Sequence, residues 1–164
     1  MNVPRVINVI KVVNSQSVDA LALLREAAVE ARALYPELFA GELQWPSNPP
    51  TPPRGTYLIA YQAEVPVGCG ALRPVDAVTV EVRRMYVSTA ARRSGVARLL
   101  LAALEAAAAR MGYNAMRLET GNRQGPAMSL YESYGFARIA PFGEYANDPT
   151  SVCYEKHIAN PSDA

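Results

Sequence analysis

The fold is decided by the stretch Arg92-Arg93-Ser94-Gly95-Val96-Ala97, which joins a strand-like run over residues 78–87 to a helix-like run over residues 96–111. Gly95 lets the backbone approach a ligand without side-chain obstruction, and the small Ala97 keeps the way clear. The first turn of the helix directs unpaired N–H groups back at this stretch, where the arginines add positive charge. The pattern predicts a turn that binds a phosphate group.

The same turn matches neither of the common nucleotide-binding motifs. It lacks the lysine of a Walker loop and the three glycines of a dinucleotide fingerprint. A strand-to-helix connection can also contain a glycine and basic residues for solubility alone. An ordinary connection therefore stays an alternative to a phosphate site on this stretch by itself.

Length and composition indicate one globular domain. The chain has 164 residues, of which 50% are hydrophobic and 19% are charged, and a chain of this size buries a full core without disulfides or metals. We expect residues 1–160 to form a single domain and residues 161–164 a loose tail. The net charge of +1 argues against nucleic-acid binding over a broad surface and leaves one local basic cluster, Arg92, Arg93 and Arg98.

Other features argue against redox, metal and membrane proteins. Cys69 and Cys153 are far apart and lack metal-type spacing, so we interpret them as buried thiols and predict no metal site. Residues 1–13 alternate in polarity and resemble an edge strand more than a signal peptide. No apolar run approaches the roughly 20 residues of a membrane span. We therefore expect a cytoplasmic protein with no membrane partner.

Periodicity predicts a mixture of strands and helices. A first helix is expected between cap residues at 15–17 and Pro36, and others over residues 96–111 and 126–134. The apolar face of the first helix is expected to consist of Leu21, Leu24, Ala28 and Ala31. Strands are expected over residues 6–13, 56–62, 67–73, 78–87, 115–120, 136–140 and 152–158. Early strands followed by strand–helix alternation predict an α/β fold with helices packed on a mixed sheet.

Two segments depart from regular patterns. Residues 36–55 contain prolines crowded around Trp45 and Asn48, which predicts a long loop. In the strand over residues 78–87 the apolar positions change from Val80 and Val82 to Met85 and Val87. Since strand side chains alternate with period two, this change predicts one extra residue, a β-bulge, near residues 83–85. An early strand end, or simple burial of Tyr86, is the alternative.

Several motifs in order resemble the GNAT superfamily of acetyl-CoA-dependent N-acetyltransferases. Arg92, Gly95 and Ala97 satisfy its pyrophosphate-loop pattern Q/R-x-x-G-x-G/A, and residues 81–87 look like its central bulged strand. Ala127-x-x-Leu130-Tyr131-x-x-x-Gly135-Phe136 is similar to its A-x-x-L/F-Y-x-x-x-G-F element. The resemblance covers roughly residues 56–156, and the segments 118–121, 141–145 and 151–156 resemble a bacterial subgroup of unassigned substrate.

The resemblance implies a GNAT fold, with a mostly antiparallel mixed sheet of six or seven strands, and direct transfer of acetyl from acetyl-CoA to a primary amine of a small molecule or peptide. It implies Tyr131 as the acid that protonates the leaving thiolate, and Glu81 beside the bulge as our candidate base. A core role for Tyr131, and a structural pairing of Glu81 with Arg83, are the alternatives. The implied cofactor-binding residues are Met85, Tyr86, Val87, Arg92, Arg93, Ser94, Gly95, Val96, Ala97, Arg98 and Asn122.

The acceptor stays open at this stage, because the amino half of the family is variable and residues 1–55 match nothing specific. Trp45 and Tyr145 are candidates for its pocket. The family resemblance implies a preference for homodimers. A CoA-binding sensor or interaction module without turnover is a different function that the sequence also allows, and nucleic-acid binding through the arginine cluster lacks the expected charge and aromatic residues.

Overall fold

The computed structural model describes residues 6–41 and 44–158, and it contains one mixed sheet of seven strands in the order β1-β2-β3-β4-β5-β7-β6. The strands β4 and β5 are parallel, and the other neighbours are antiparallel. The strands are β1 Asn8–Val12, β2 Thr56–Gln62, β3 Val65–Pro74, β4 Thr79–Val87, β5 Ala115–Gly121, β6 Ala137–Ile139 and β7 Ser151–His157. The helices are α1 Val18–Leu34, α2 Val96–Arg110 and α3 Gly125–Tyr134.

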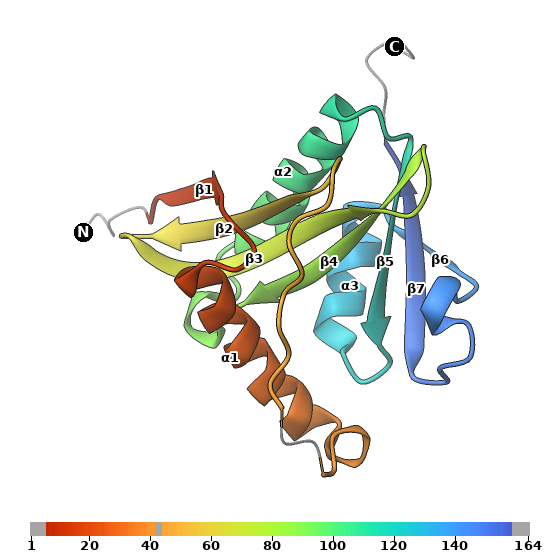
Figure 1. Cartoon of the computed structure of the whole chain (residues 1–164), viewed down its shortest axis with the longest axis horizontal. Coiled ribbons are helices and arrows are strands. Elements are labelled where there is room, and N and C mark those ends of the chain that lie inside the picture. The colour runs from red at the N-terminus through yellow and green to blue at the C-terminus, as the bar shows by residue number, and fades with distance from the viewer. Residues whose placement is uncertain (1–5, 42–43, 159–164) are drawn as a thin grey trace.

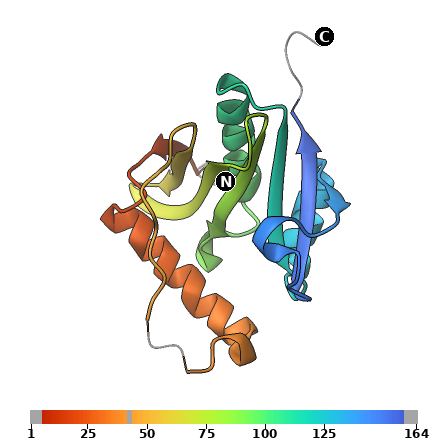
Figure 2. The ribbon, with the colours of Figure 1, turned by 45° about the vertical axis from the view of Figure 1, so that its right-hand side comes forward.

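The helices cover both faces of the sheet (Figure 1, Figure 2). Residues of α2 and α3 form the larger core with one face of the strands, around Leu100, Leu104 and Tyr131. The other face carries α1, whose Ala20 and Leu23 pack in a smaller core with Tyr57, Ile59 and Cys69. The mixed α/β architecture predicted from the periodicity is thus confirmed. In the described part of the chain no helix is long and apolar enough to cross a bilayer.

Helix α1 begins as predicted, but its buried face is rotated from the one that we expected. The Ser17 side chain accepts a hydrogen bond from the Ala20 N–H at 3.3 Å and caps the helix. Leu21 is 40% exposed, whereas Leu23 is fully buried. The expectation for Leu21 was wrong because Leu24 shares a helix face both with Leu21 and with the buried Ala20, and only the position of the sheet decides which face is covered.

The segment between α1 and β2 is the long loop that its prolines predicted. After a short 3-10 turn at Pro36–Leu38 it contains no regular element among the described residues up to β2. It returns across the α1 side of the sheet (Figure 1) and is attached there by the buried Asn48. The Asn48 amide donates to Ser15 O at 2.7 Å, and the Ser15 hydroxyl donates to Pro49 O at 2.7 Å. Residues 42–43 and the predicted tail lie outside the described residues.

The β-bulge predicted in β4 is confirmed. Between β3 and β4 the register passes from Cys69–Tyr86 to Ala71–Arg83, so β4 contains one residue more than β3 over this interval. The extra residue lies at Arg84, whose φ of 60° is in the left-handed region that residues with a side chain rarely adopt. As a result Arg83 and Arg84 both lie on the α1 side, whereas Met85 contacts the α2 core.

Beyond the bulge β4 separates from its parallel neighbour. The pairing of β4 with β5 ends at Val82 and Leu118. From there β5 continues to Gly121 beside β7, while β4 continues to Val87 beside β3. The two strands diverge in both ribbon views (Figure 1, Figure 2). The sheet therefore opens beside the strained segment of β4.

Candidate active site

The amino end of α2 forms a group of backbone donors. Gly95 precedes the helix with φ of 84° and ψ of 6°, and a Cβ placed on it would meet no atom within 4 Å. The carbonyl of Gly95 accepts the first hydrogen bond of the helix, from Leu99 N–H at 3.1 Å. Within the described residues no group accepts a hydrogen bond from the amides of residues 93–98. This open turn has the N–H groups and the positive helix end that favour an anion.

The three arginines of this region are not equivalent. Arg92 is bound to the protein itself, because it donates to Glu30 of α1 at 2.5 Å and to Val87 O at 2.9 Å. Arg98 donates to Ser133 of α3 at 3.1 Å. Arg93 is exposed, and its φ of 62° is also left-handed. Arg93 therefore adds charge to the turn, whereas Arg92 mainly ties the turn to α1.

The bulge leaves residues of β4 without ladder partners next to the open edge. Arg84 and Met85 have no register partner in β3, and no strand pairs with the other edge of β4 beyond Val82 in the part of the chain that the structure describes. Tyr86 and Val87 regain partners in β3 only. The amides of Met85 and Val87 thus lie on the segment of β4 that follows the point where β4 and β5 separate. A donor at such an edge can stabilise an oxygen that becomes negative in the transition state.

Tyr131 is on the α2 side of the sheet, on α3. It is buried among aromatic rings, 5.9 Å from the ring of Phe136 and 6.1 Å from that of Tyr154. Burial raises the pKa of its hydroxyl, and the nearby Glu119 adds to this effect. The hydroxyl is therefore a neutral proton donor at physiological pH.

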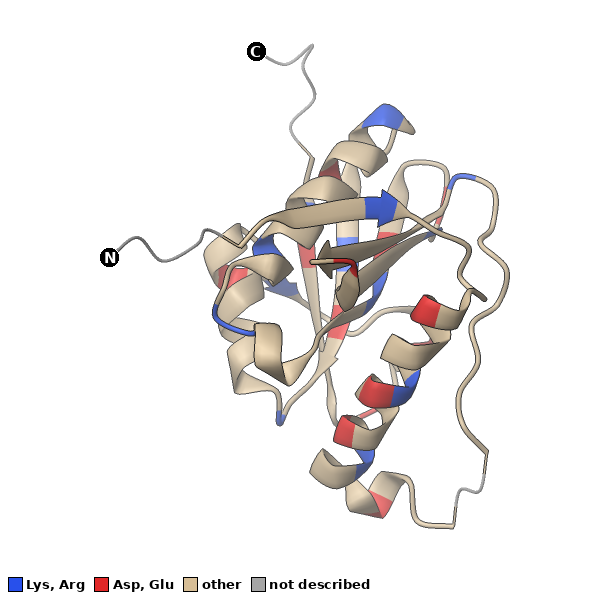
Figure 3. Cartoon of the chain, turned by 90° about the vertical axis from the view of Figure 1, so that its left-hand side faces the viewer, with Lys and Arg blue, Asp and Glu red and all other residues tan. Residues whose placement is uncertain are grey.

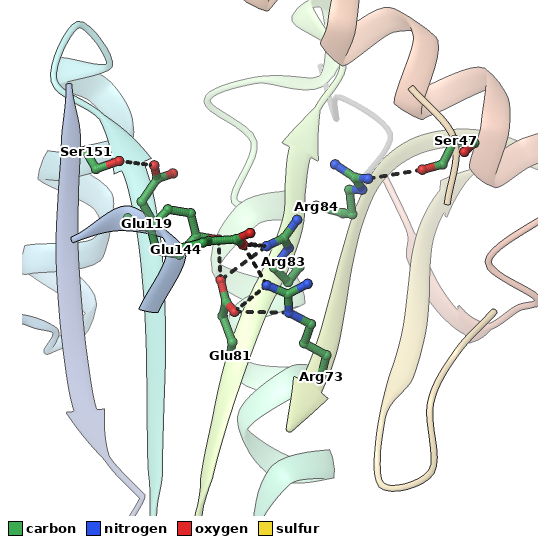
Figure 4. A network of polar contacts seen from close by, with 9 residues as sticks. Ser47, Arg73, Glu81, Arg83, Arg84, Glu119, Glu144 and Ser151 are labelled. Carbon is green, nitrogen blue, oxygen red and sulfur yellow. Dashed lines mark hydrogen bonds and ion pairs between the residues drawn. The ribbon is translucent and has the colours of Figure 1, made fainter. Parts of the chain in front are cut away.

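Glu81 lies on the opposite side of the sheet, in an ionic network (Figure 4). Its carboxylate accepts from Arg73 Nε at 3.1 Å and from the Tyr145 hydroxyl at 2.6 Å, and lies 3.5 Å from Arg83. Glu144 pairs with both arginines, at 2.8 Å to Arg73 and 3.0 Å to Arg83. The pairing of Glu81 with Arg83 that the sequence suggested is thus present. Only 3% of Glu81 is exposed, so any proton it takes must arrive by way of these partners or a water.

Glu119 is a second carboxylate at the opening, and sequence reasoning missed it. It is the first residue of β5 after the pairing with β4 ends, and it is half-buried. Its carboxylate accepts a hydrogen bond from the Ser151 hydroxyl at 2.6 Å. Burial raises the pKa of its carboxyl. The alternation of Leu118 and Glu119 in β5 indicated a strand, but only the separation of the strands distinguishes this carboxylate from a surface one.

A cleft of about 730 Å³ lies between α1 and the bulge. Leu24, Ala28 and Met85 give it an apolar wall, and Arg84 gives it a cation. Trp45 also lines the cleft, with the guanidinium groups of Arg25 and Arg32 at 4.5 and 4.1 Å from its ring. The volume lies within the range of small-molecule sites.

Two other predicted positions, Asn122 and Tyr145, do not line this cleft. Asn122 follows β5, and its backbone N–H donates to Thr150 O at 2.8 Å. Tyr145 belongs to the ionic network, where its hydroxyl also accepts from Arg83 at 2.7 Å. The two cysteines are free and buried, as predicted. Burial raises the pKa of Cys69 to about 11, so its thiol stays protonated.

Charges on the α1 side do not form a single basic surface. Figure 3 shows acidic and basic residues interspersed along α1. Glu26 and Glu30 of this helix bind groups near the turn that precedes α2. Glu26 accepts a hydrogen bond from the Ser88 hydroxyl at 3.0 Å, and Glu30 accepts one from Arg92. Such a mixture of charges is unlike the continuous basic patch of a nucleic-acid-binding surface.

Comparison with known sequences identifies the same elements. The sequence profile of the acetyltransferase (GNAT) family matches residues 20–136. An uncharacterized N-acetyltransferase, YsnE of Bacillus subtilis, is 37% identical over 108 residues, which are 65% of this chain and 72% of that protein. An IAA acetyltransferase of Azospirillum brasilense is 40% identical over 103 residues, which are 62% of this chain and 67% of that protein.

Comparison with solved structures extends the likeness to nearly the whole chain. A protein of Klebsiella pneumoniae described as an acyl-CoA N-acyltransferase superposes with a TM-score of 0.75 at 29% identity, over 93% of this chain and 98% of that chain. A GNAT family acetyltransferase of Elizabethkingia anophelis with acetyl-CoA bound has a TM-score of 0.64 at 20% identity, over 92% of this chain and 97% of that one. The seven-stranded sheet with its three helices is therefore the acyl-CoA N-acyltransferase fold.

Proposed function

Since the chain belongs to the GNAT family of acetyltransferases, we propose that it transfers the acetyl group of acetyl-CoA directly to a primary amine of a small molecule or peptide. One observation carries this proposal. The amides of residues 93–98, which have no acceptor in the described chain, lie next in sequence to the bulged edge of β4, where that strand has left β5. These two features fit the two ends of a CoA thioester, its diphosphate and its acyl group.

The residues around Gly95 suit a diphosphate. Since a Cβ at this position would have no atom within 4 Å, a phosphate has room to approach the backbone. The helix end and Arg93 supply positive potential, and Val96, Ala97 and Arg98 supply N–H donors. When bound, acetyl-CoA supplies the activated acetyl group. The affinity for the diphosphate should therefore depend on the helix end more than on any one arginine.

The transfer itself requires a donor for the thioester oxygen and two proton transfers. We assign the first role to the backbone N–H of Met85 or Tyr86, which can stabilise the developing negative charge. Tyr131 donates its hydroxyl proton to the departing thiolate, a role that its burial supports by keeping it neutral. An alkyl ammonium has a pKa near ~10, so the acceptor must lose a proton before it attacks.

Glu81 remains our proposed base. Because its oxygens are engaged by Arg73 and Tyr145, it would act through water. Glu119 is the alternative carboxylate on the other side of the opening, and its raised pKa suits proton uptake. Replacing each carboxylate by its amide distinguishes the two.

Release of free CoA thiol from acetyl-CoA in the presence of an amine panel tests the proposed function. We expect release that depends on both the enzyme and the amine, together with an acetylated amine of the corresponding mass. Calorimetric binding of CoA without release on any amine would instead favour a CoA-binding module without turnover. The cytoplasmic location, the homodimer and the single domain over residues 1–160 stay predictions.

A further inference from the structure

Arg84 is the charged residue that the bulge contributes to the cleft on the α1 side. As the extra residue of β4 it has a left-handed φ of 60°, a conformation that costs energy for a residue with a side chain. The bulge brings Arg84 to the same side of the sheet as Arg83. An unbulged strand would direct the side chains of two consecutive residues to opposite faces. The bulge therefore places Arg84 on the α1 side of the sheet, where it lines the cleft.

The two neighbouring arginines differ in how their charge is balanced (Figure 4). Arg83 lies 3.0 Å from Glu144 and 3.5 Å from Glu81. Arg84 has neutral partners only, since its Nε donates to Asn48 Oδ1 at 3.0 Å and its Nη2 to Ser47 O at 3.3 Å. In the described chain no carboxylate lies within ion-pair distance of Arg84. Burial and the nearby Arg83 lower the pKa of Arg84, as expected for a cation without a counter-ion.

The guanidinium of Arg84 has a donor without an acceptor in the described chain. A guanidinium carries five N–H groups, and the Nη1 nitrogen of Arg84 has no acceptor in the described chain. Within the same residues no fully buried side-chain nitrogen or oxygen lacks a partner, so this nitrogen is reached by solvent. Arg84 lines the 730 Å³ cleft, and it also lines a smaller cavity of about 190 Å³ beside the proline-rich loop. An anion in the cleft can thus bind Arg84 without displacing Asn48.

The rest of the cleft is apolar. Leu24, Ala27, Ala28 and Ala31 of α1 form one wall, and Phe39 and Met85 contribute to the others. The one other cation on its lining in the described chain, Arg32, stacks on Trp45 and donates to Gln44 O at 2.8 Å. A ligand that fits this lining has one anionic group near Arg84 and an apolar group along α1.

We propose that the acceptor is an apolar α-amino acid, whose carboxylate binds Arg84 and whose side chain occupies the cleft against α1. This inference rests on the proposed acetyl transfer and names its substrate class. Arg84 and Met85, whose backbone is assigned to the thioester, both line the same cleft. The carboxylate and amine of an α-amino acid are separated by one carbon, so a carboxylate on Arg84 holds the amine close to the acetyl group. The bond from nitrogen to the acetyl carbon forms, the carbon–sulfur bond breaks, and the products are an N-acetyl amino acid and CoA.

The test compares each acid with its uncharged amide. Thiol release from acetyl-CoA is measured with L-phenylalanine, L-phenylalaninamide, L-leucine and L-leucinamide. For the wild-type chain we expect kcat/KM to be at least ~10-fold higher for the acids than for the amides. For Arg84→Gln we expect kcat/KM to fall by about 10²-fold for the acids, as for loss of charge-assisted hydrogen bonds, and to change less than ~3-fold for the amides.

Two further variants separate recognition from a merely structural role. Arg84→Lys keeps the charge and is expected to retain most of the preference for acids. Arg83→Gln, at the neutralised neighbour, is expected to leave the acid-to-amide ratio unchanged whatever it does to the overall rate. If Arg84 only holds the loop through Asn48 and Ser47, Arg84→Gln will lower the rates for acids and amides equally, and the inference is overturned. Should Arg84→Gln fail to fold, the acid-to-amide ratio of kcat/KM in the wild-type chain and in Arg84→Lys still tests the inference.

Failure of this inference is distinguishable from failure of the proposed function. Acetylation of amides or simple amines as fast as the amino acids would overturn the substrate class and leave acetyl transfer standing. An absence of thiol release with every amine of the panel, in a chain that melts cooperatively, would overturn both.

Discussion

The two sides of the β4 bulge differ in the chemical groups that they present. On the α2 side the site consists of backbone amides at residues 93–98 and a neutral tyrosine, Tyr131. On the α1 side it consists of charged side chains, with Arg73 and Glu81 paired and Arg84 without a carboxylate partner in the described chain. Backbone amides can serve any chain that has the turn, whereas side-chain charges are particular to one acceptor. The difference teaches that the family motifs around Gly95 and Tyr131 lie on the α2 side, whereas the side that we propose for the acceptor is built from charged side chains.

The largest expected effect concerns the acid on the α2 side. Tyr131→Phe removes the proton donor and keeps the ring that packs on Phe136 and Tyr154, so acetyl transfer should slow by ~10²–10⁴-fold while acetyl-CoA affinity is kept. The measurement is single-turnover thiol release beside calorimetry. Tyr134→Phe is the matched control, since this tyrosine of the same helix donates to Glu105 and is outside the site. Unchanged turnover in Tyr131→Phe would remove it from the mechanism.

The next effect concerns the phosphate turn. Gly95→Glu puts a carboxylate where we expect the diphosphate, and should weaken CoA binding by at least ~10²-fold, since each charge-assisted hydrogen bond is worth ~1.5–3 kcal/mol. The control is Gly112→Glu at the other end of α2, where φ is 87° and the backbone strain is similar. Calorimetry is expected to show that only the first variant loses affinity. Equal affinities would contradict the location of the turn.

A smaller effect separates the two carboxylates on the acceptor side. If Glu81 is the base, Glu81→Gln lowers kcat/KM by about 10²-fold and Glu119→Gln by less than ~3-fold. Glu81→Gln should also lower the melting temperature, because it removes the charge of the buried carboxylate that pairs with Arg73 and Arg83. The reverse order of kcat/KM would assign the base to Glu119.

The smallest effect is on stability. Because burial raises the pKa of Glu119 in the folded state, the stability that this group contributes is present below its unfolded pKa and is lost as pH rises through its folded pKa. Glu119→Gln removes the ionisation and should raise the melting temperature by roughly 1–2 °C at pH 7 and by less at pH 4. The measurement is thermal unfolding at both pH values. A lower melting temperature at pH 7 would show that the bond from Ser151 outweighs the burial of charge.

The donor side could be predicted from the sequence because its signals are local. Gly95 and the apolar residues of α2 are within one short stretch, and the change of parity between Val82 and Met85 located the bulge to within a residue. Neither inference required knowledge of β3, the strand that pairs with β4 at the bulge. The physical reason is that a turn and a helix end are set by neighbouring residues.

The acceptor side could not be predicted because its contacts join distant parts of the chain. Arg84 meets Asn48, 36 residues away, and Arg83 meets Glu144, 61 residues away. The sequence contains Arg83 and Arg84 as equal neighbours, and nothing local indicates that only one is neutralised. Arg92 binds Glu30, 62 residues away, a partner that nothing local in the sequence indicates. Only the packing of α1, the proline-rich loop and the turn Gly143–Tyr145 against the sheet decides these partners.

The central claim is that backbone amides at the amino end of α2 bind the diphosphate of CoA. Backbone amide chemical shifts recorded during titration with CoA test it most directly, with pantetheine, which lacks the diphosphate, as the comparison ligand. We predict that the amides of residues 94–98 shift with CoA but not with pantetheine, while those of Met85 and Val87 shift with both. Unmoved amides at residues 94–98 at saturating CoA would contradict the account.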